Sequence, residues 1–266
     1  MRRGPGTLGV AWLKGYTIAY LGLIDLPVLL LPIFSLNDSI YVALPFKGLT
    51  LQWWREMVAQ DGMHAALWNS IKVAAPVAFI STALGTAAAK ALTSGRLPFA
   101  GLVTSLYALP LVIPFIILGI ALLIGFNRIG FGLSLYTVAI GHILICLPFA
   151  VFVLLSRFEG FDRNLEEAAQ DLGETPWMTF WRVTFPIVLP GIIASLLLTF
   201  TISFDEFLLA FFLTGNQSTL PLYIFSQLRF PAKLPAVLAL GSAILVATFI
   251  IVALAERLRR QDGSKP

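Results

Sequence analysis

The sequence predicts an all-α protein that crosses a membrane six times. Of its 266 residues, 58% are apolar and only 12% are charged, and the mean hydropathy is +0.87. Soluble domains have about 45–50% apolar and about 25% charged residues. The composition therefore excludes a soluble enzyme, a disordered chain and a disulfide scaffold. The single cysteine, Cys146, has no partner in the chain for a disulfide.

Six apolar segments supply the membrane helices. A helix needs roughly 20 apolar residues to cross the hydrocarbon core, and a lipid-exposed backbone must satisfy its own hydrogen bonds. The runs also lack the alternating pattern of barrel strands. The predicted spans are 16–34, 70–89, 102–124, 133–155, 187–213 and 235–255. We expect residues 1–266 to form one transmembrane domain, and we expect the first span to be retained rather than cleaved as a signal peptide.

Basic residues indicate the orientation of these spans. With the amino terminus in the cytoplasm, 12 of the 18 Lys and Arg residues fall on the cytoplasmic side and six on the opposite side. The cytoplasmic twelve are Arg2, Arg3, Lys14, Lys90, Arg96, Arg157, Arg163, Arg182, Arg257, Arg259, Arg260 and Lys265. The bias predicts a multi-pass protein with both termini in the cytoplasm. Because these residues lie at the ends of apolar segments and form no basic face, we expect no nucleic-acid partner.

Two features stand out in the first half of the chain. The long outer loop 35–68 contains Trp53 and Trp54, which are typical of anchors at a membrane interface. The third span contains Pro110 and Pro114, which predict a bend in that helix. A bent helix suits the lining of a translocation path.

The cytoplasmic loop 156–185 is predicted to form two short helices. Asn164 can cap the first helix, with Glu167 completing a capping box, and Gly173 stands where a left-handed terminator is needed. Thr175 is the expected cap of the second helix, with Pro176 at its first position. Three arginines and six acids give the loop a net charge of −3. It is either a solvated linker or a docking element for another protein.

A motif in this loop favours docking. The motif consists of Glu167-Ala168-Ala169, three residues, Gly173, nine residues, and Val183-Thr184-Phe185-Pro186. It resembles the EAA signature of permease subunits of binding-protein-dependent ABC transporters, the type I importers, whose pattern ends in Ile-x-Leu-Pro. This resemblance implies the type I importer permease fold. It also implies that Glu167, Ala168, Ala169 and Gly173 form a coupling helix that sits in a groove of an ATPase subunit.

The likeness extends to the spermidine/putrescine branch of these permeases. It is carried by Ser203-x-Asp205-Glu206, by Phe212-x-Thr214-Gly215 and by Leu220-Pro221-Leu222-Tyr223. That branch carries an acidic residue after the proline of the third span, where this chain has Leu111. The shared motifs make a polyamine the expected cargo. The departure at Leu111 leaves an amino-acid-like or other small organic amine as the alternative.

Asp205 and Glu206 are the expected contacts for that cargo. A carboxylate within a span costs about 2.5–3.5 kcal/mol to insert, and such residues normally face a bundle interior or an aqueous path. We expect Asp205 and Glu206, with Ser203 beside them, to line the path of a cationic substrate, and the resemblance implies that Trp53 lies near the outer gate. The alternative is a structural ion pair with Lys72.

The chain has no phosphate-binding loop and does not contain even a Gly-Lys dipeptide. It also lacks metalloprotease and nucleophile-elbow motifs. We therefore expect no catalytic residues, no metal and no cofactor, with ATP bound by a separate subunit. By resemblance, the partners are two ABC ATPase subunits, a second and paralogous permease chain, and a periplasmic or extracellular binding protein. The expected location is a bacterial inner membrane. A secondary transporter is a remote alternative.

Overall fold

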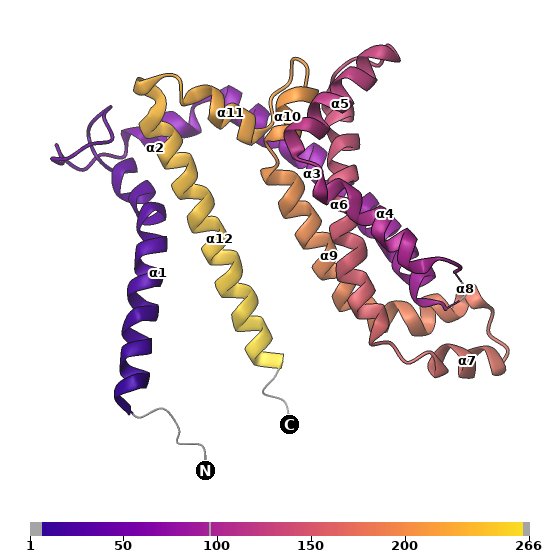
Figure 1. Ribbon diagram of the computed structural model, residues 1–266. Coiled ribbons are helices and arrows are strands. Elements are labelled where there is room, and N and C mark those ends of the chain that lie inside the picture. Colours follow the sequence, from indigo (N-terminus) through magenta and orange to yellow (C-terminus); the bar gives the residue numbers. More distant parts are fainter. Residues whose placement is uncertain (1–6, 96, 263–266) are drawn as a thin grey trace. The chain divides into compact units, whose positions relative to one another are not determined.

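The computed structural model describes residues 7–95 and 97–262, with side chains described for 12–95 and 97–250. Four of the cytoplasmic basic residues, Arg2, Arg3, Arg96 and Lys265, lie outside the described residues. The regular elements of the described chain are all helices (Figure 1), and an isolated β-bridge within it joins Asn37 to Leu49.

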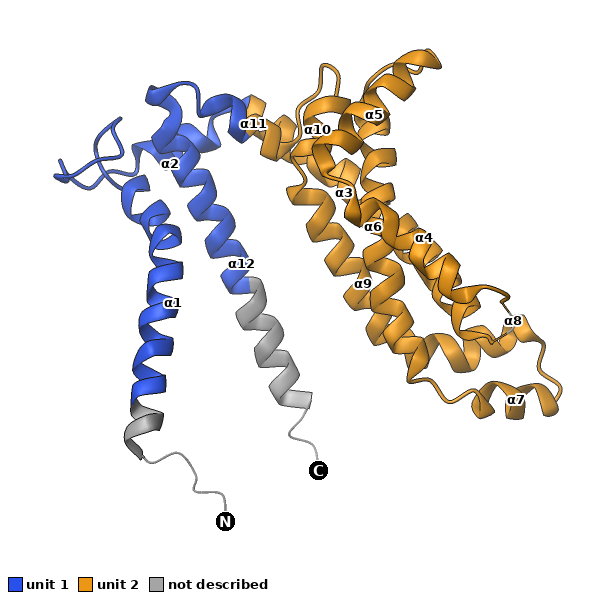
Figure 2. Ribbon diagram, in the orientation of Figure 1, with its two compact units in different colours: residues 1–61, 224–266 blue, residues 62–223 orange. Residues whose placement is uncertain are grey.

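Most of the helices follow one another with short connections, and the longest described connection, residues 36–51, follows the first helix. They are α1 (Thr7–Ser35), α2 (Gln52–Val58), α3 (Asp61–Thr93), α4 (Ala100–Val112), α5 (Phe115–Arg128), α6 (Leu135–Glu159), α7 (Asn164–Asp171), α8 (Pro176–Thr179), the π-helix η1 (Phe180–Thr184), α9 (Phe185–Asp205), α10 (Leu208–Leu213), α11 (Leu220–Gln227), the 3-10 helix η2 (Pro231–Lys233) and α12 (Leu234–Asp262). The chain divides into two compact units, Met1–Asp61 with Ile224–Pro266 and Gly62–Tyr223 (Figure 2).

The prediction of an all-α membrane protein is confirmed. Five described helical stretches are long and apolar enough to span a membrane, and a sixth is added if the bent pair α4 and α5 counts as one span. The five are Trp12–Ser35, Asp61–Thr93, Leu135–Glu159, Pro176–Asp205 and Pro231–Ile250.

The third span is broken rather than gently bent. Helices α4 and α5 meet at an angle of 95° around Ile113 and Pro114. Ile113 is extended, with φ −78° and ψ 127°, because the ring of a following proline disfavours the helical conformation. Pro110 lies inside α4 and does not end it, so the predicted bend falls at Pro114 alone.

The fifth span also differs from the predicted segment 187–213. A continuous helical stretch begins at Pro176, passes through the π-helix η1 and ends at Asp205. Glu206 is extended, with φ −72° and ψ 115°, and α10 begins afterwards at Leu208. The acids that we expected in mid-helix therefore lie at a helix break.

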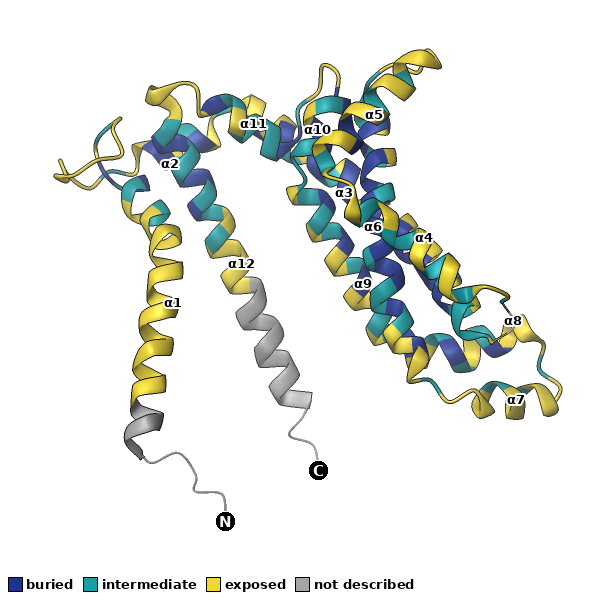
Figure 3. Cartoon of the chain, in the orientation of Figure 1, coloured by how far each residue is buried: buried dark blue, intermediate teal, exposed yellow. Residues whose placement is uncertain are grey.

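The second unit has its core where α3, α6, α9 and α10 pack. Figure 3 shows burial concentrated on the facing sides of these helices. Ser81, Gly85 and Ala89 recur at every fourth position of α3 and are all buried. A Cβ atom added at Gly85 would lie 2.8 Å from the Cβ of Ala150 in α6. Such small residues let membrane helices approach closely without a hydrophobic driving force.

The first unit contains α1, α2 and α12. The ring of Trp53 in α2 is only 6% exposed, and its Nε1 donates a hydrogen bond of 2.8 Å to the carbonyl oxygen of Asn37. Trp54 donates to the hydroxyl of Ser35 at 3.2 Å. The described side chains of α1 are mostly exposed (Figure 3). The two tryptophans thus tie α2 to the last residue of α1 and to the segment that follows it.

Candidate functional site

The cytoplasmic loop folds into two short helices, as predicted, but α7 begins differently. Asn164 is the first helical residue and makes no side-chain cap, so the predicted capping box with Glu167 is wrong. The Oδ1 atom of Asp162 instead accepts a hydrogen bond of 3.0 Å from the backbone N–H of Asn164. Asp162 stands two residues earlier and offers the same kind of short polar acceptor, which shifts the start of the helix.

The end of α7 is the one predicted. Gly173 has φ +93°, a conformation that side chains other than glycine rarely adopt. Its N–H donates to the carbonyl of Gln170 at 2.9 Å. Thr175 then caps α8 by accepting from the N–H of Met178 at 3.3 Å, and Pro176 is at the first helical position. Both of these predictions are confirmed.

The four expected coupling residues lie together at α7 and its end. Glu167, Ala168 and Gly173 are exposed, and Ala169 is half-buried. Leu172, which we did not select, is 88% exposed beside them. The sequence feature that could have indicated Leu172 as a contact residue is its position as a lone leucine directly before the terminating glycine, in an otherwise acidic stretch. A small, exposed, partly apolar ridge of this kind can pack closely against another protein.

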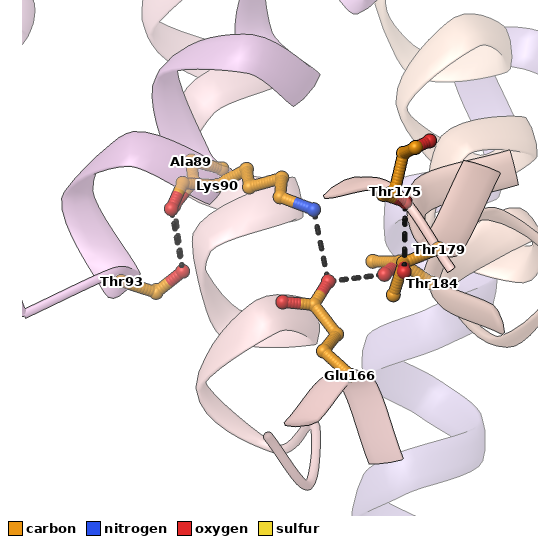
Figure 4. A network of polar contacts seen from close by, with 7 residues as sticks. All are labelled: Ala89, Lys90, Thr93, Glu166, Thr175, Thr179 and Thr184. Atoms are coloured by element: carbon orange, nitrogen blue, oxygen red, sulfur yellow. Dashed lines mark hydrogen bonds and ion pairs between the residues drawn. The ribbon is translucent and has the colours of Figure 1, made fainter. Parts of the chain in front are cut away.

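The first turn of α7 is attached to the rest of the second unit by a polar network (Figure 4). Lys90 Nζ, from the end of α3, lies 2.8 Å from Glu166 Oε1, and the hydroxyl of Thr184 donates to the same oxygen. Arg163 Nη1 donates to the carbonyl of Ser94 at 3.0 Å. We did not select these residues from the sequence, because their pairing joins segments far apart in the chain.

This network sets the charge state of Glu166. Partial burial alone would raise the pKa of its carboxyl group. The hydrogen bonds from Lys90 and Thr184 and the charges of Lys90 and Arg163 outweigh burial, so the pKa lies below its ordinary value. The carboxylate is therefore ionised at neutral pH and able to hold Lys90.

A line of buried hydroxyl groups joins the transmembrane helices of the same unit. Thr82 of α3 lies within hydrogen-bonding distance of Ser195 at 3.2 Å and of Thr199 at 3.4 Å, both in α9. The thiol of Cys146 in α6 donates to the carbonyl of Thr199 at 3.6 Å. Such polar contacts hold helices together in lipid.

The line continues to Ser203, one of the predicted path residues. Ser203 is buried, and its hydroxyl lies 2.9 Å from Nδ1 of the buried His142. Ser195, Thr199 and Ser203 recur every four residues on one face of α9, and this spacing was the signal that could have revealed the line. Ser203 therefore packs against α6.

The two predicted acids have different surroundings. Asp205 ends α9 and is exposed within this chain. Glu206 is half-buried, and its Oε1 accepts a hydrogen bond of 3.0 Å from the N–H of Leu209 in the first turn of α10. Glu206 thus acts as a cap for α10, whereas Asp205 is the more exposed of the two acids.

The alternative ion pair with Lys72 is not formed between described residues. Lys72 Nζ instead lies 5.9 Å from the centre of the Trp68 ring, as in a cation–π contact. Ion pairs are seen between Lys90 and Glu166 and between Arg182 and Glu174. Of the four predicted path residues, Ser203, Asp205 and Glu206 belong to the second unit, and Trp53 is a buried residue of the first.

Comparison with known proteins assigns the chain to a family. Residues 81–261 match the family model described as binding-protein-dependent transport system inner membrane component. The putrescine transport system permease protein PotI of Escherichia coli (strain K12) is 34% identical over 272 residues, which cover 95% of this chain and 93% of that protein. The spermidine/putrescine transport system permease protein PotC of the same strain is 30% identical over 252 residues, 94% of each chain.

Solved structures agree on the fold. A chain from a bacterial ABC transporter involved in the import of the acidic polysaccharide alginate superposes with a TM-score of 0.70 at 12% sequence identity, covering 95% of this chain and 99% of that one. A second structure of an alginate transporter, in complex with a pentasaccharide-bound periplasmic protein, gives a TM-score of 0.67 at 16% identity, with 96% of each chain covered. The chain described here belongs to the family of inner membrane permease components of binding-protein-dependent transport systems.

Proposed function

We propose that this chain is the permease subunit of an ATP-driven importer and forms half of the translocation path for a polyamine such as putrescine or spermidine. The observation that carries the proposal is 34% and 30% identity to two polyamine permeases along almost the whole chain. The exposed carboxylate of Asp205 adds a chemical reason, since it can pair with a protonated amine.

The energy source is a separate ATPase pair. Two features support this part of the proposal: the chain has no phosphate-binding loop, and α7 presents an exposed ridge that ends at Gly173. ATP binding closes the ATPase pair and displaces α7, and hydrolysis returns it. The ridge of Glu167, Ala168, Ala169 and Gly173 forms the contact with the ATPase.

A second permease chain and a soluble binding protein complete the importer. Six spans supply half of a path, and the mostly exposed side chains of α1 leave an apolar helix surface for lipid or for the second chain. The binding protein delivers the polyamine at the face opposite to α7. Both termini lie in the cytoplasm, as the distribution of Lys and Arg indicates.

The substrate alternative is a small organic amine with one positive charge, such as an amino-acid-like compound. Leu111 favours it, because the acid expected at that position in the polyamine branch is missing and leaves one fewer carboxylate for a second ammonium group. Asp205 serves equally well for a single ammonium group.

Uptake by the reconstituted complex tests the proposal. The permease pair, the ATPase and the binding protein are placed in liposomes, and ATP-dependent uptake of labelled putrescine, spermidine and a neutral amino acid is measured. We expect both polyamines to accumulate only with ATP. Uptake of the amino acid alone would support the alternative substrate, and uptake driven by a proton or sodium gradient without ATP would refute the importer.

A further inference from the structure

Three segments that are distant in sequence meet at Glu166. The last turn of α3 contributes Lys90, the first turn of α7 contributes Glu166 itself, and η1 contributes Thr184 (Figure 4). Lys90 Nζ also lies 4.7 Å from the centre of the Phe180 ring, at the other end of η1. Lys90 therefore contacts both α7 and η1.

A single carboxylate oxygen of Glu166 accepts hydrogen bonds from two neighbouring segments. Its Oε1 accepts from Lys90 at 2.8 Å and from the buried hydroxyl of Thr184. Charge-assisted hydrogen bonds of this kind are stronger than neutral ones. Arg163, just before α7, adds the bond to Ser94 beyond the end of α3. The start of α7 is therefore tied to both neighbouring segments, and the exposed residues Glu167 and Ala168 project next to this attachment.

The connection through Thr184 leads into α9, the helix that carries the candidate path residue Asp205. Thr184 ends η1, and α9 continues from Phe185 to Asp205 without a break. A π-helical turn within a longer helix is frequent at functional sites. A displacement of α7 reaches α9 through Thr184 and reaches α3 through Lys90.

We propose that Lys90 and Glu166 form a latch that makes α7 move together with α3 and α9, so that ATP hydrolysis at the docked ATPase drives transport. Both residues are positioning residues, because neither belongs to the docking ridge or to the path. The inference rests on the proposed function as an ATP-driven importer. Without the latch, α7 moves together with the groove of the ATPase, and the transmembrane helices do not move with it.

The test compares uptake with hydrolysis in proteoliposomes that contain the complete transporter. Lys90→Met removes the charge at similar length, and Glu166→Gln removes the charge but keeps an acceptor. We expect ATP hydrolysis near the wild-type rate and a fall of about fivefold in substrate imported per ATP for Lys90→Met. The fall should be smaller for Glu166→Gln.

Glu174→Gln is the matched control. Glu174 forms an ion pair with Arg182 in the same loop, but that pair does not involve α3. We expect this variant to keep the wild-type ratio of import to hydrolysis. The double variant Lys90→Glu with Glu166→Lys restores the ion pair and should recover part of the ratio. Its remaining deficit reflects the lost contact between Lys90 and the Phe180 ring and the lost hydrogen bond from Thr184, because a lysine at position 166 cannot accept it.

A second measurement needs no substrate, so it separates failure of the latch from failure of the proposed function. Hydrogen exchange of the α7 amides is compared in the full-length subunit in nanodiscs. We expect faster exchange in Lys90→Met than in the wild type, and wild-type exchange in Glu174→Gln. Equal exchange in all three proteins, or an import ratio unchanged in Lys90→Met, would overturn the latch. Failure of the wild type to import a polyamine would overturn only the substrate.

Discussion

The contact between α3 and α6 at Gly85 predicts a stability defect for a single added methyl group. In Gly85→Ala, the new Cβ would lie 2.8 Å from the Cβ of Ala150, 3.1 Å from its backbone carbon and 3.2 Å from the nitrogen of Val151. Two of these atoms are backbone atoms of α6 and cannot move away as a flexible side chain can. The helices must therefore separate.

The cost follows from overpacking. An added methyl group in a well-packed core costs typically about 1–3 kcal/mol, and this term outweighs the gain of up to about 1 kcal/mol from helix propensity. A loss of 1 kcal/mol lowers the midpoint of thermal unfolding by about 2–4 °C in a chain of 150–250 residues. Separation of α3 from α6 also threatens the contacts of Thr82 with Ser195 and Thr199.

Gly125→Ala is the control, because Gly125 is also helical and nothing lies within 4 Å of its added Cβ. The assay is the loss of monodisperse protein on heating in detergent, followed by size-exclusion chromatography. We expect a lower midpoint for Gly85→Ala and an unchanged or raised midpoint for Gly125→Ala. Equal midpoints for both variants would show that α3 and α6 do not approach as closely as described.

Three further predictions concern the coupling loop and the path. Gly173→Ala strains the end of α7 by about 1–3 kcal/mol and should weaken co-purification with the ATPase, whereas Gly160→Ala, where φ is negative, should not. Asp205→Asn should lower polyamine uptake without changing the unfolding temperature, whereas Glu206→Ala should destabilise the protein by about 0.5–2 kcal/mol through loss of the α10 cap. Because the pKa of Glu166 is lowered by folding, its stabilising effect is complete above the ordinary glutamate pKa of about 4.3 and disappears as the pH falls through the lower folded value. The difference in unfolding temperature between the wild type and Glu166→Gln should therefore be constant near neutral pH and vanish in acid; a difference that persists in acid would contradict this assignment.

Local chemistry made parts of the structure predictable. A terminating glycine and a Thr-Pro pair act within a few residues, so Gly173, Thr175 and Pro176 were assigned correctly from the sequence. The break at Pro114 follows from the ring of one residue. The start of α7 was misassigned because Asp162 and Asn164 offer competing acceptors, and local pattern alone does not rank them.

Long-range features were not predictable in the same way. The apolar run continues past Asp205 to Leu213, so hydropathy alone extends the fifth span across a helix break. The pairing of Lys90 with Glu166 depends on how α3 and α7 are placed in space, which no local pattern records. Three of the four predicted path residues thus proved to have structural contacts, Ser203 with His142, Glu206 with α10 and Trp53 with the carbonyl of Asn37.

The burial of Cys146 has a practical consequence for experiments on this protein. It is the chain's single cysteine, it is fully buried, and its thiol is engaged by the carbonyl of Thr199. A thiol-specific probe therefore finds no accessible site on the native chain. A cysteine introduced at an exposed position such as Leu172 or Asp205 would be the preferred point of attachment, so spin labels or fluorophores can follow α7 and the end of α9 without first replacing the native cysteine.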